Sequence, residues 1–329
     1  MKVLLAGYLG FGNVGDEAIA ASVAGRLQAA GHEVRLLSGH PSDSRRTHGV
    51  MAYHRLWGVP AGLLWADALV FGGGGLLQDK SSRRSLAYYL ALLNWASRLG
   101  VQRVLFGQSI GPLSPAGARS VARALAGADV LVRDAASQER LAAMGVDAAL
   151  GADAALGLPT VEHTEEPEGW LLIPRADVAG AQAALEAFAR RCVADGIPVS
   201  AMATEPGEDD AAVAALVACG ATAVPAGSVA DARAAVAARQ GVVSVRLHGM
   251  IFALGLKRMA VGVAYDPKVT AFASETGFGV VDVPVETDAL LEAVSQAQPA
   301  PDEAALAMQA RLEDGFAWLK RTLAKGTAG

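Results

Sequence analysis

A cation and an imidazole stand two residues apart where a β-branched stretch gives way to a helix-like one. Residues 242–254 read VVSVRLHGMIFAL, and the change falls at Arg246, His248 and Gly249. A guanidinium binds phosphate and carboxylate groups, an imidazole transfers protons near neutral pH, and amides at a helix start attract anions. The stretch therefore predicts a site for a phosphorylated or carboxylated small molecule. A structural explanation stays open, in which Arg246 pairs with a neighbouring acid and His248 caps a turn.

A lysine follows the next strand-like stretch, MAVGVAY. Lys268 ends the segment AYDPK, directly after that stretch. If both stretches are parallel strands of one sheet, their ends lie at the same edge, and Lys268 then lies near Arg246. A lysine is a point charge on a flexible stem, which suits a phosphate, although a solvated side chain is the simpler structural explanation.

Glycine-rich and polar segments also follow the strand-like stretches of the first half. They read GYLGFGNVGDE, GGGGLLQD, GQSIGP and RD. Ordering four consecutive glycines, Gly72 to Gly75, costs conformational entropy, so we interpret them as bare backbone that a ligand approaches rather than as packing. Parallel connections keep one hand, so these segments are expected to meet at one rim of a sheet. The side chains expected at this rim include those of Asp16, Asp79 and Asp134.

A dinucleotide-binding motif is suggested by Gly10, Gly12 and Gly15, which match G-x-G-x-x-G. Asp16 and Glu17 argue against it, because they place negative charge where a pyrophosphate would dock. The next strand-like stretch, VRLLSG, also lacks an acid for a ribose. Acids in a first helical turn also favour the helix dipole, which is a structural explanation for the pair. We therefore expect no nicotinamide or flavin site.

The order of strand-like and helix-like segments predicts an α/β protein with two doubly wound, Rossmann-like domains that face each other across a cleft. The first domain is expected to span residues 1–158 and to carry the glycine-rich loops. A linker is expected at 159–169, and a second domain at 170–300. The last segment, 301–329, predicts an amphipathic helix that packs back across the junction. Domain junctions are favoured places for ligands.

Composition excludes several classes of function. The net charge is -5 and no basic stripe occurs, so a nucleic-acid partner is not expected. Cys192 and Cys219 lack metal-ligand spacing and are expected to pack in the core, and no metal site or cofactor is predicted. The start MKVLLAG is too short for a signal-peptide core, and no basic amphipathic helix indicates stable membrane attachment. We expect a cytoplasmic protein with at most transient membrane contact at the inner face.

Taken together, these motifs resemble those of the polysaccharide pyruvyl transferase family, and within it the CsaB type, which pyruvylates a secondary cell-wall polymer that anchors S-layers. The resemblance covers nearly the whole chain. It rests on GNVGDE, FGGGGLLQD, GQSIGP, VRD, RLHG and YDPK in the family order. It implies a fold similar to the GT-B glycosyltransferases, phosphoenolpyruvate as donor substrate, and an N-acetylmannosamine-type acceptor that becomes a 4,6-ketal. It leaves open whether the acceptor is lipid-linked, and it does not indicate an oligomeric state.

The resemblance also implies roles for individual residues. It places Arg246, His248 and Lys268 at the donor site, with Arg133 as a further anion contact. His248 is then the general acid or base, and Asp16, Asp79 or Asp134 orients or deprotonates the acceptor hydroxyls. The residues predicted to act in catalysis are His248 and Asp16, and those predicted to bind substrates are Arg246, Lys268, Arg133, Gly12, Asn13, Gly73, Gly74, Gln78, Asp79, Gln108, Ser109 and Gly249.

Two other functions remain as alternatives. A GT-B glycosyltransferase that uses a nucleotide sugar is compatible with two doubly wound sheets, because a fold does not determine function. Such an enzyme is expected to carry a ribose-binding acid near residues 227–257, and the sequence offers no convincing one. A noncatalytic carbohydrate-binding or scaffolding protein is the second alternative, and the many polar strand ends argue against it.

Overall fold

The computed structural model describes residues 1–80, 82–161, 163 and 165–326. Contacts within the chain divide it into two compact units. Unit 1 comprises Met1–Phe11, Asp16–Leu158 and the segment from Met308 onward, and unit 2 comprises Gly12–Gly15 and Pro159–Ala307. The short segment Gly12–Gly15 thus belongs by its contacts to unit 2, although it lies in the first glycine-rich loop of the sequence.

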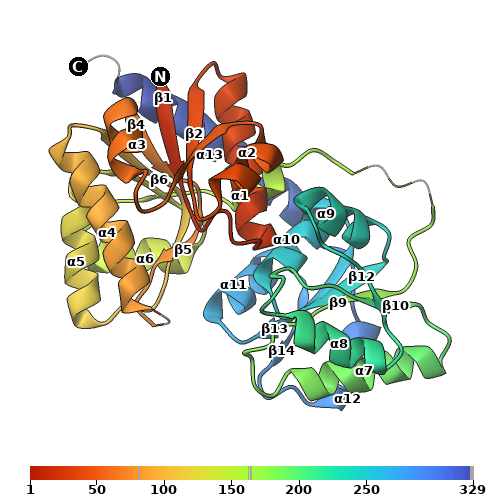
Figure 1. Ribbon diagram of the computed structural model, residues 1–329. Coiled ribbons are helices and arrows are strands. Elements are labelled where there is room, and N and C mark those ends of the chain that lie inside the picture. Colours follow the sequence, from red (N-terminus) through yellow and green to blue (C-terminus); the bar gives the residue numbers. More distant parts are fainter. Residues whose placement is uncertain (81, 162, 164, 327–329) are drawn as a thin grey trace. The chain divides into compact units, whose positions relative to one another are not determined.

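Unit 1 is built on a parallel sheet with the strand order β3-β2-β1-β4-β6-β7-β8, and β5 pairs with β6 (Figure 1). The strands are β1 (Lys2–Ala6), β2 (Glu33–Ser38), β3 (Met51–His54), β4 (Ala68–Phe71), β5 (Gly74–Leu77), β6 (Gln102–Ile110), β7 (Asp129–Val132) and β8 (Ala149–Leu150). Every residue of β4 is buried, as expected for a central strand covered by helices on both faces. The strand order reverses between β1 and β4, so this point is where a doubly wound sheet binds ligands.

Helices cover the unit 1 sheet. They are α1 (Val14–Ala29), α2 (Pro41–His48), α3 (Val59–Trp65), α4 (Arg83–Arg98), α5 (Pro115–Leu125) and α6 (Ala135–Ala143), with a short 3₁₀ helix η1 at Ala154–Gly157. One apolar core joins the strands to α3, α4, α5 and α6, with Tyr89 of α4 against Phe71 of β4. The long helix α13 (Asp302–Lys325) contributes Phe316, whose ring lies 5.0 Å from that of Phe106 on β6.

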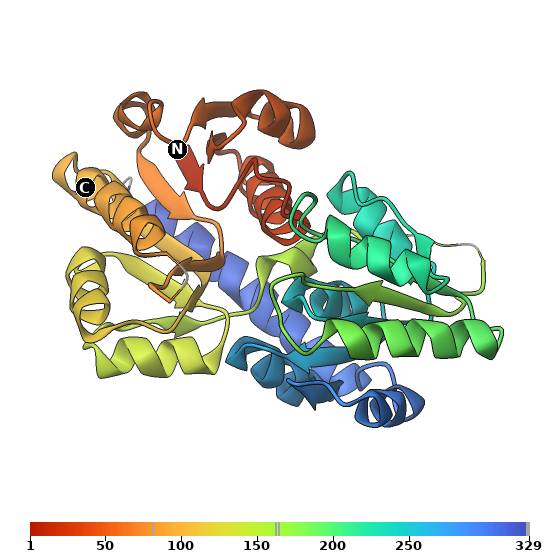
Figure 2. The same ribbon diagram turned by 60° about the horizontal axis from the view of Figure 1, so that its bottom comes forward.

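Unit 2 is a second parallel sheet, with the order β11-β10-β9-β12-β13-β14. Its strands are β9 (Trp170–Ile173), β10 (Val199–Ala201), β11 (Thr222–Ala223), β12 (Gly241–Ser244), β13 (Met259–Ala264) and β14 (Gly279–Asp282). Its helices are α7 (Gln182–Ala194), α8 (Asp210–Ala218), α9 (Val229–Ala237), α10 (Leu247–Gly255), α11 (Pro267–Thr276) and α12 (Thr287–Ser295). Figures 1 and 2 both show α7 and α8 side by side on this unit. The strand order reverses between β9 and β12.

The predicted fold class of two doubly wound α/β domains is confirmed by these two sheets. Several local predictions were wrong. Gly107, Gln108 and Ser109 were expected in a loop, but they lie inside β6, whose pairing with β7 is interrupted between Phe106 and Gln108. Part of the glycine run forms β5 rather than a loop. Elements α2, β3, α4, α5 and α11 were not predicted.

The expected linker and C-terminal segment are only partly covered, because residues 162, 164 and 327–329 lie outside the described residues. The helix expected at the C-terminus is α13, and its residues from Met308 onward belong to unit 1. Cys192 is buried in the unit 2 core and Cys219 packs against that core, as predicted. Among the described residues, no helix has both the length and the apolar character needed to cross a bilayer.

Candidate functional site

The reversal point of unit 2 carries two arginines. Strands β9 and β12 pair in parallel, with Ile173 opposite Ser244, and the chain continues from them to Arg175 and Arg246. Both side chains line an open pocket of about 350 Å³. The residues around it are Arg175, Ala176, Asp177, Glu205, Glu208, Asp209 and Arg246. Adjacent parallel strands thus place two guanidinium groups at the ligand-binding edge of the sheet.

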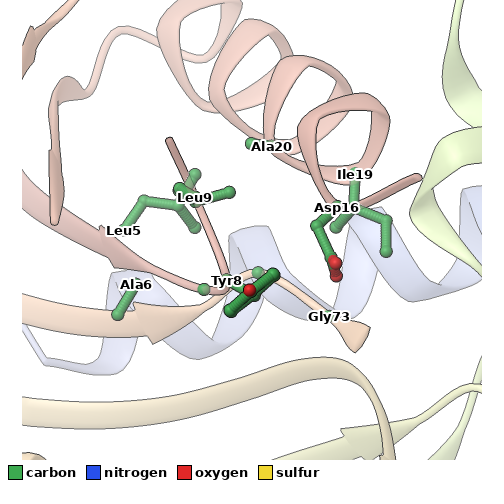
Figure 3. Close-up of a pocket in the computed structure, with 10 residues that line it drawn as sticks. Leu5, Ala6, Tyr8, Leu9, Asp16, Ile19, Ala20 and Gly73 are labelled. Carbon is green, nitrogen blue, oxygen red and sulfur yellow. The ribbon is translucent and has the colours of Figure 1, made fainter. Parts of the chain in front are cut away.

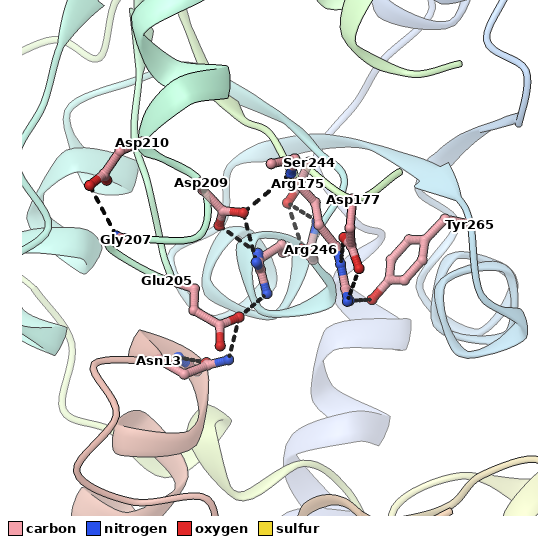
Figure 4. A network of polar contacts seen from close by, with 12 residues as sticks. Asn13, Arg175, Asp177, Glu205, Gly207, Asp209, Asp210, Ser244, Arg246 and Tyr265 are labelled. Carbon is pink, nitrogen blue, oxygen red and sulfur yellow. Dashed lines mark hydrogen bonds and ion pairs between the residues drawn. The ribbon is translucent and has the colours of Figure 1, made fainter. Parts of the chain in front are cut away.

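Arg246 is paired with two carboxylates. Its Nη1 donates to Glu205 Oε2 at 2.6 Å and its Nη2 donates to Asp209 Oδ1 at 2.7 Å (Figure 4). Burial lowers the pKa of Arg246, but the hydrogen bond to Asp209 and the charges of both acids outweigh it and hold this pKa above its ordinary value. Arg246 therefore pairs with neighbouring acids, which is the structural explanation that the sequence had left open. This pairing also fixes the guanidinium at the pocket wall.

Arg175 is the site residue that sequence reasoning missed. Its Nε and Nη2 donate to the Asp177 carboxylate at 2.5 and 2.9 Å, and its Nη1 donates to the Tyr265 hydroxyl at 2.9 Å (Figure 4). The hydrogen bond from Arg175 lowers the pKa of Asp177, and it raises the pKa of Arg175 itself. The charge of Arg175 acts to lower the pKa of Arg246, as expected for two cations close together. The signal in the sequence was the polar end of WLLIPR, the first strand of the second half.

His248 lies in the first turn of α10 rather than in a loop. Arg246 occupies the N-cap position of this helix, without a side-chain cap hydrogen bond. A Cβ added to Gly15 would lie 2.0 Å from His248 Nδ1, so the imidazole lies directly against the backbone of Gly15. Gly249, a predicted binding residue, instead permits close packing, because a Cβ there would lie 2.3 Å from Ser244 Oγ.

The segment Gly12–Gly15 forms hydrogen bonds with residues beside the pocket. The Val14 amide donates to Thr204 O at 2.9 Å, and Asn13 Nδ2 donates to Glu205 Oε2 at 3.4 Å. Gly12 has a φ of 79°, in the left-handed region that favours glycine. The predicted residues Gly12 and Asn13 are thus brought together with Arg246 and His248.

Lys268 does not line this pocket, but it lies near Tyr265, a hydrogen-bond partner of Arg175. It is the second residue of α11, its amide donates to the N-cap carboxylate of Asp266 at 3.1 Å, and its Nζ lies 4.0 Å from Asp266 Oδ2. Its Nζ also lies 5.6 Å from the centroid of the Tyr265 ring, while the hydroxyl of that tyrosine accepts from Arg175. Tyr265 thus contacts both Lys268 and Arg175, which is consistent with the prediction that Lys268 lies near the strand-end arginines.

The reversal point of unit 1 holds a much smaller pocket, shown in Figure 3. Its lining consists of Leu5, Ala6, Gly7, Tyr8, Leu9, Asp16, Ile19, Ala20, Gly72 and Gly73. A Cβ on Gly72 would lie 2.9 Å from Leu5 Cδ1, and one on Gly73 would lie 2.8 Å from Ile19 Cγ2. These two glycines therefore permit close packing, and both also line this pocket. A Cβ on Gly74 would lie 2.8 Å from Asp16 Oδ1, so this glycine makes room for the carboxylate.

Other residues of unit 1 that were predicted to bind substrate form hydrogen bonds and an ion pair within the chain. Gln108 is fully buried and its Nε2 donates to Gly73 O at 2.7 Å, so it supports the glycine loop. Arg133 is buried, forms an ion pair with Asp153, and donates through Nε to Ser109 Oγ at 2.7 Å. Burial lowers the pKa of Arg133, but the charges of Asp153, Asp134 and Asp16 and the hydrogen bond to Asp153 together outweigh it and raise that pKa. The anion contact predicted for Arg133 is filled by the chain's own carboxylate.

The predicted acids Asp79 and Asp134 hold local structure. Asp134 is the N-cap of α6, where it accepts from the Ser137 amide at 2.8 Å and from Ser109 Oγ at 2.6 Å. Asp79 accepts from the amide and the hydroxyl of Ser114, and these hydrogen bonds lower the pKa of its carboxyl. Gln78 packs beside Gly111, where a Cβ would lie 2.3 Å from the Gln78 Cβ. Within the described residues, no group of three His, Cys, Asp or Glu side chains is placed to hold a metal ion.

Comparisons with known proteins bear on the family and the fold of this chain. Residues 13–267 match the family model for polysaccharide pyruvyl transferase. Alr3699/HepE of Anabaena in complex with UDP superposes with a TM-score of 0.65 at 11% identity, over 99% of this chain and 100% of that one. The UDP-GlcNAc 2-epimerase of Neisseria meningitidis bound to UDP-GlcNAc superposes with a TM-score of 0.60 at 12% identity, over 99% of this chain and 100% of that one. No curated protein sequence gives a significant match. The structural likeness confirms the predicted GT-B-like fold.

Proposed function

Because the chain belongs to the polysaccharide pyruvyl transferase family, we propose that it transfers the pyruvyl group of phosphoenolpyruvate to a sugar. The acceptor is an N-acetylmannosamine-type sugar of a cell-wall polysaccharide precursor, as in the CsaB type, and it becomes a 4,6-ketal while phosphate is released. The observation that carries this proposal is the pair Arg175 and Arg246, which line one pocket at the reversal point of unit 2. Two guanidinium groups suit a donor that carries both a phosphate and a carboxylate.

The donor is proposed to replace carboxylates that now neutralise these arginines. The Asp177 side chain is 68% exposed and that of Glu205 is 17% exposed, whereas that of Asp209 is only 1% exposed. An incoming anion therefore competes with Asp177 for Arg175 and with Glu205 for Arg246, while Asp209 keeps Arg246 in place. Amides at the start of α10 and the ammonium group of Lys268 add positive potential.

The reaction requires two proton movements. One sugar hydroxyl adds to C2 of phosphoenolpyruvate while C3 gains a proton and becomes a methyl group. The C2–O bond to phosphate then breaks, and the second hydroxyl forms the other C–O bond of the ketal. The sugar hydroxyls lose two protons. One balances the proton that C3 gains, and the other leaves with phosphate. We assign His248 as the acid or base of this exchange and Asp16 as the group that orients the acceptor hydroxyls. No step uses a cofactor.

A single assay tests the proposal. The purified chain is incubated with the acceptor sugar and phosphoenolpyruvate, and free phosphate is followed over time. Acceptor-dependent phosphate release, with a ketal in the product, is expected. His248→Ala is expected to lower the rate by about 10² to 10⁴, the range of general acid–base catalysis. Phosphate release that persists unchanged in His248→Ala would remove the role assigned to this residue.

A glycosyltransferase is the second candidate, because solved structures with this fold hold UDP or a UDP-sugar. The same incubation with UDP-sugars in place of phosphoenolpyruvate separates the two functions. Release of UDP would favour glycosyl transfer, and release of neither product would favour a carbohydrate-binding protein. Because the acceptor is a cell-wall precursor in this proposal, we place the protein in the cytoplasm, with transient contact at the inner membrane face if the precursor is lipid-linked.

A further inference from the structure

Arg55 is a strand-end cation of unit 1 that lies over aromatic rings. It directly follows β3, and its guanidinium carbon lies 4.3 Å from the ring centroid of Tyr88, 5.2 Å from that of Phe11 and 6.0 Å from that of Tyr89. Within the part of the chain that the structure describes, no carboxylate lies within 4.0 Å of it. Arg133 and Arg246, at other strand ends, each have such a partner.

The loops after three parallel strands hold this arrangement together. Phe11, from the loop after β1, stacks on Tyr8 with ring centroids 4.5 Å apart and an interplanar angle of 18°. Gly39, after β2, lies under the Phe11 ring, because a Cβ there would lie 2.5 Å from Phe11 Cζ. The Tyr88 hydroxyl donates to Arg55 O at 2.7 Å, which fixes the backbone that carries the guanidinium. The cation is thus held in place before any ligand arrives.

We infer that Arg55, with the rings of Phe11, Tyr8 and Tyr88, forms an anion site that binds the phosphate of a glycosyl phosphate. A half-buried guanidinium without a carboxylate keeps its donors for a ligand, and its planar fork matches phosphate oxygens. The stacked rings of Tyr8 and Phe11 offer a flat apolar surface for the C–H face of the attached pyranose. The identity of the sugar rests on the proposed function. The site therefore selects acceptors that carry a phosphate at the anomeric position.

A discrete phosphate fits this site better than a membrane surface. Each Lys or Arg near an anionic bilayer contributes only about 1 kcal/mol, so stable attachment needs several cations acting together. Arg55 is half-buried among rings and is suited to one ligand group.

The test is a calorimetric titration of the full chain without phosphoenolpyruvate. The two probes are N-acetylmannosamine 1-phosphate and methyl N-acetylmannosaminide, which lacks the phosphate. The 1-phosphate is expected to bind at least about tenfold more tightly, as for one charge-assisted contact of about 1.4 kcal/mol. Arg55→Gln should abolish this difference, and Arg55→Lys should restore part of it. Arg119→Gln, which removes an exposed arginine of α5, is the matched control and should keep the full difference.

Three results would overturn the site. The preference for the 1-phosphate could survive in Arg55→Gln, or it could disappear in Arg175→Gln instead, which would assign the phosphate to unit 2. Arg55-dependent sedimentation with phosphatidylglycerol vesicles, without any preference between the two sugars, would also reject it. Thermal unfolding checks that each variant is folded. The titration is independent of the phosphate-release assay, so loss of phosphate release alone would reject the proposed function and leave this site standing.

Discussion

Glu205 Oε2 lies 2.6 Å from Arg246 Nη1, and the same oxygen accepts from Asn13 at 3.4 Å. One carboxylate thus links a strand-end cation of unit 2 to the segment Gly12–Gly15, which belongs to the same unit. In the proposed function an anionic donor competes with Glu205 for Arg246, so donor binding would also break the contact between Glu205 and Asn13. The proposed donor site and the first glycine-rich loop therefore share one acid.

Glu205→Gln should strengthen donor binding. The change removes a negative charge that competes for Arg246 and repels the donor, while Asp209 still holds the guanidinium. We expect the KM for phosphoenolpyruvate to fall about threefold to tenfold, the effect of one partly screened charge. Steady-state phosphate release over a range of donor concentrations measures it. Glu186→Gln on α7, which removes an acid outside the pocket, should leave KM unchanged. A raised KM in Glu205→Gln would show that this acid supports the site.

Arg175→Gln should weaken donor binding without unfolding the chain. The Arg175 side chain is 27% exposed and its partner Asp177 is 68% exposed, so no buried charge is left unpaired. Loss of one charge-assisted contact is expected to raise the KM for phosphoenolpyruvate about tenfold to a hundredfold. Arg191→Gln, which breaks the exposed pair with Asp195 on α7, is the matched control and should have the KM of the unchanged chain. An unchanged KM in Arg175→Gln would exclude this residue from the donor site.

Sequence reasoning found the strand-end residues because parallel strands bring their carboxyl ends to one edge. This rule predicted that Arg246, His248 and Lys268 lie near one another, and the structure places Arg246 and Lys268 after the adjacent parallel strands β12 and β13. It could not predict that Glu205 and Asp209 pair with Arg246, because these acids follow β10, a different strand, and show no local pattern. Such pairing depends on side-chain positions that only the folded sheet defines.

Glycine was the least informative residue type. The sequence suggested loops at Gly107 and at Gly73, yet Gly107 lies within β6 and Gly73 packs against Ile19. A glycine can serve a positive φ, a close contact or a ligand, and the sequence does not distinguish these uses. Gly15 shows the same ambiguity, because it matched a dinucleotide-binding pattern and in the structure makes room for the imidazole of His248.

Stability at alkaline pH should depend on Cys192. Burial raises the pKa of this thiol to about 11, against 9.0 for an ordinary thiol. The folded chain therefore holds a proton that the unfolded chain loses, so the stability linked to Cys192 is complete below pH 9 and declines as the pH rises to about 11. Urea unfolding at pH 7 and pH 10.5 should show a smaller alkaline loss in Cys192→Ala than in Cys219→Ala. Equal losses in the two variants would assign the alkaline destabilisation to other groups.

Gly15→Ala should impair catalysis while it leaves the fold intact. Gly15 is helical and its φ is not positive, so the backbone accepts alanine, but the new Cβ would lie 2.0 Å from His248 Nδ1 and must displace the ring. Phosphate release is expected to fall at least about tenfold, towards the loss of about 10² to 10⁴ for a missing acid or base. Gly25→Ala in the same helix is the matched control, because no atom lies within 4 Å of its Cβ. That variant should keep full activity and gain up to about 1 kcal/mol of stability from helix propensity. Full activity in Gly15→Ala, with a normal unfolding midpoint, would show that the position of His248 against this loop does not matter for the reaction.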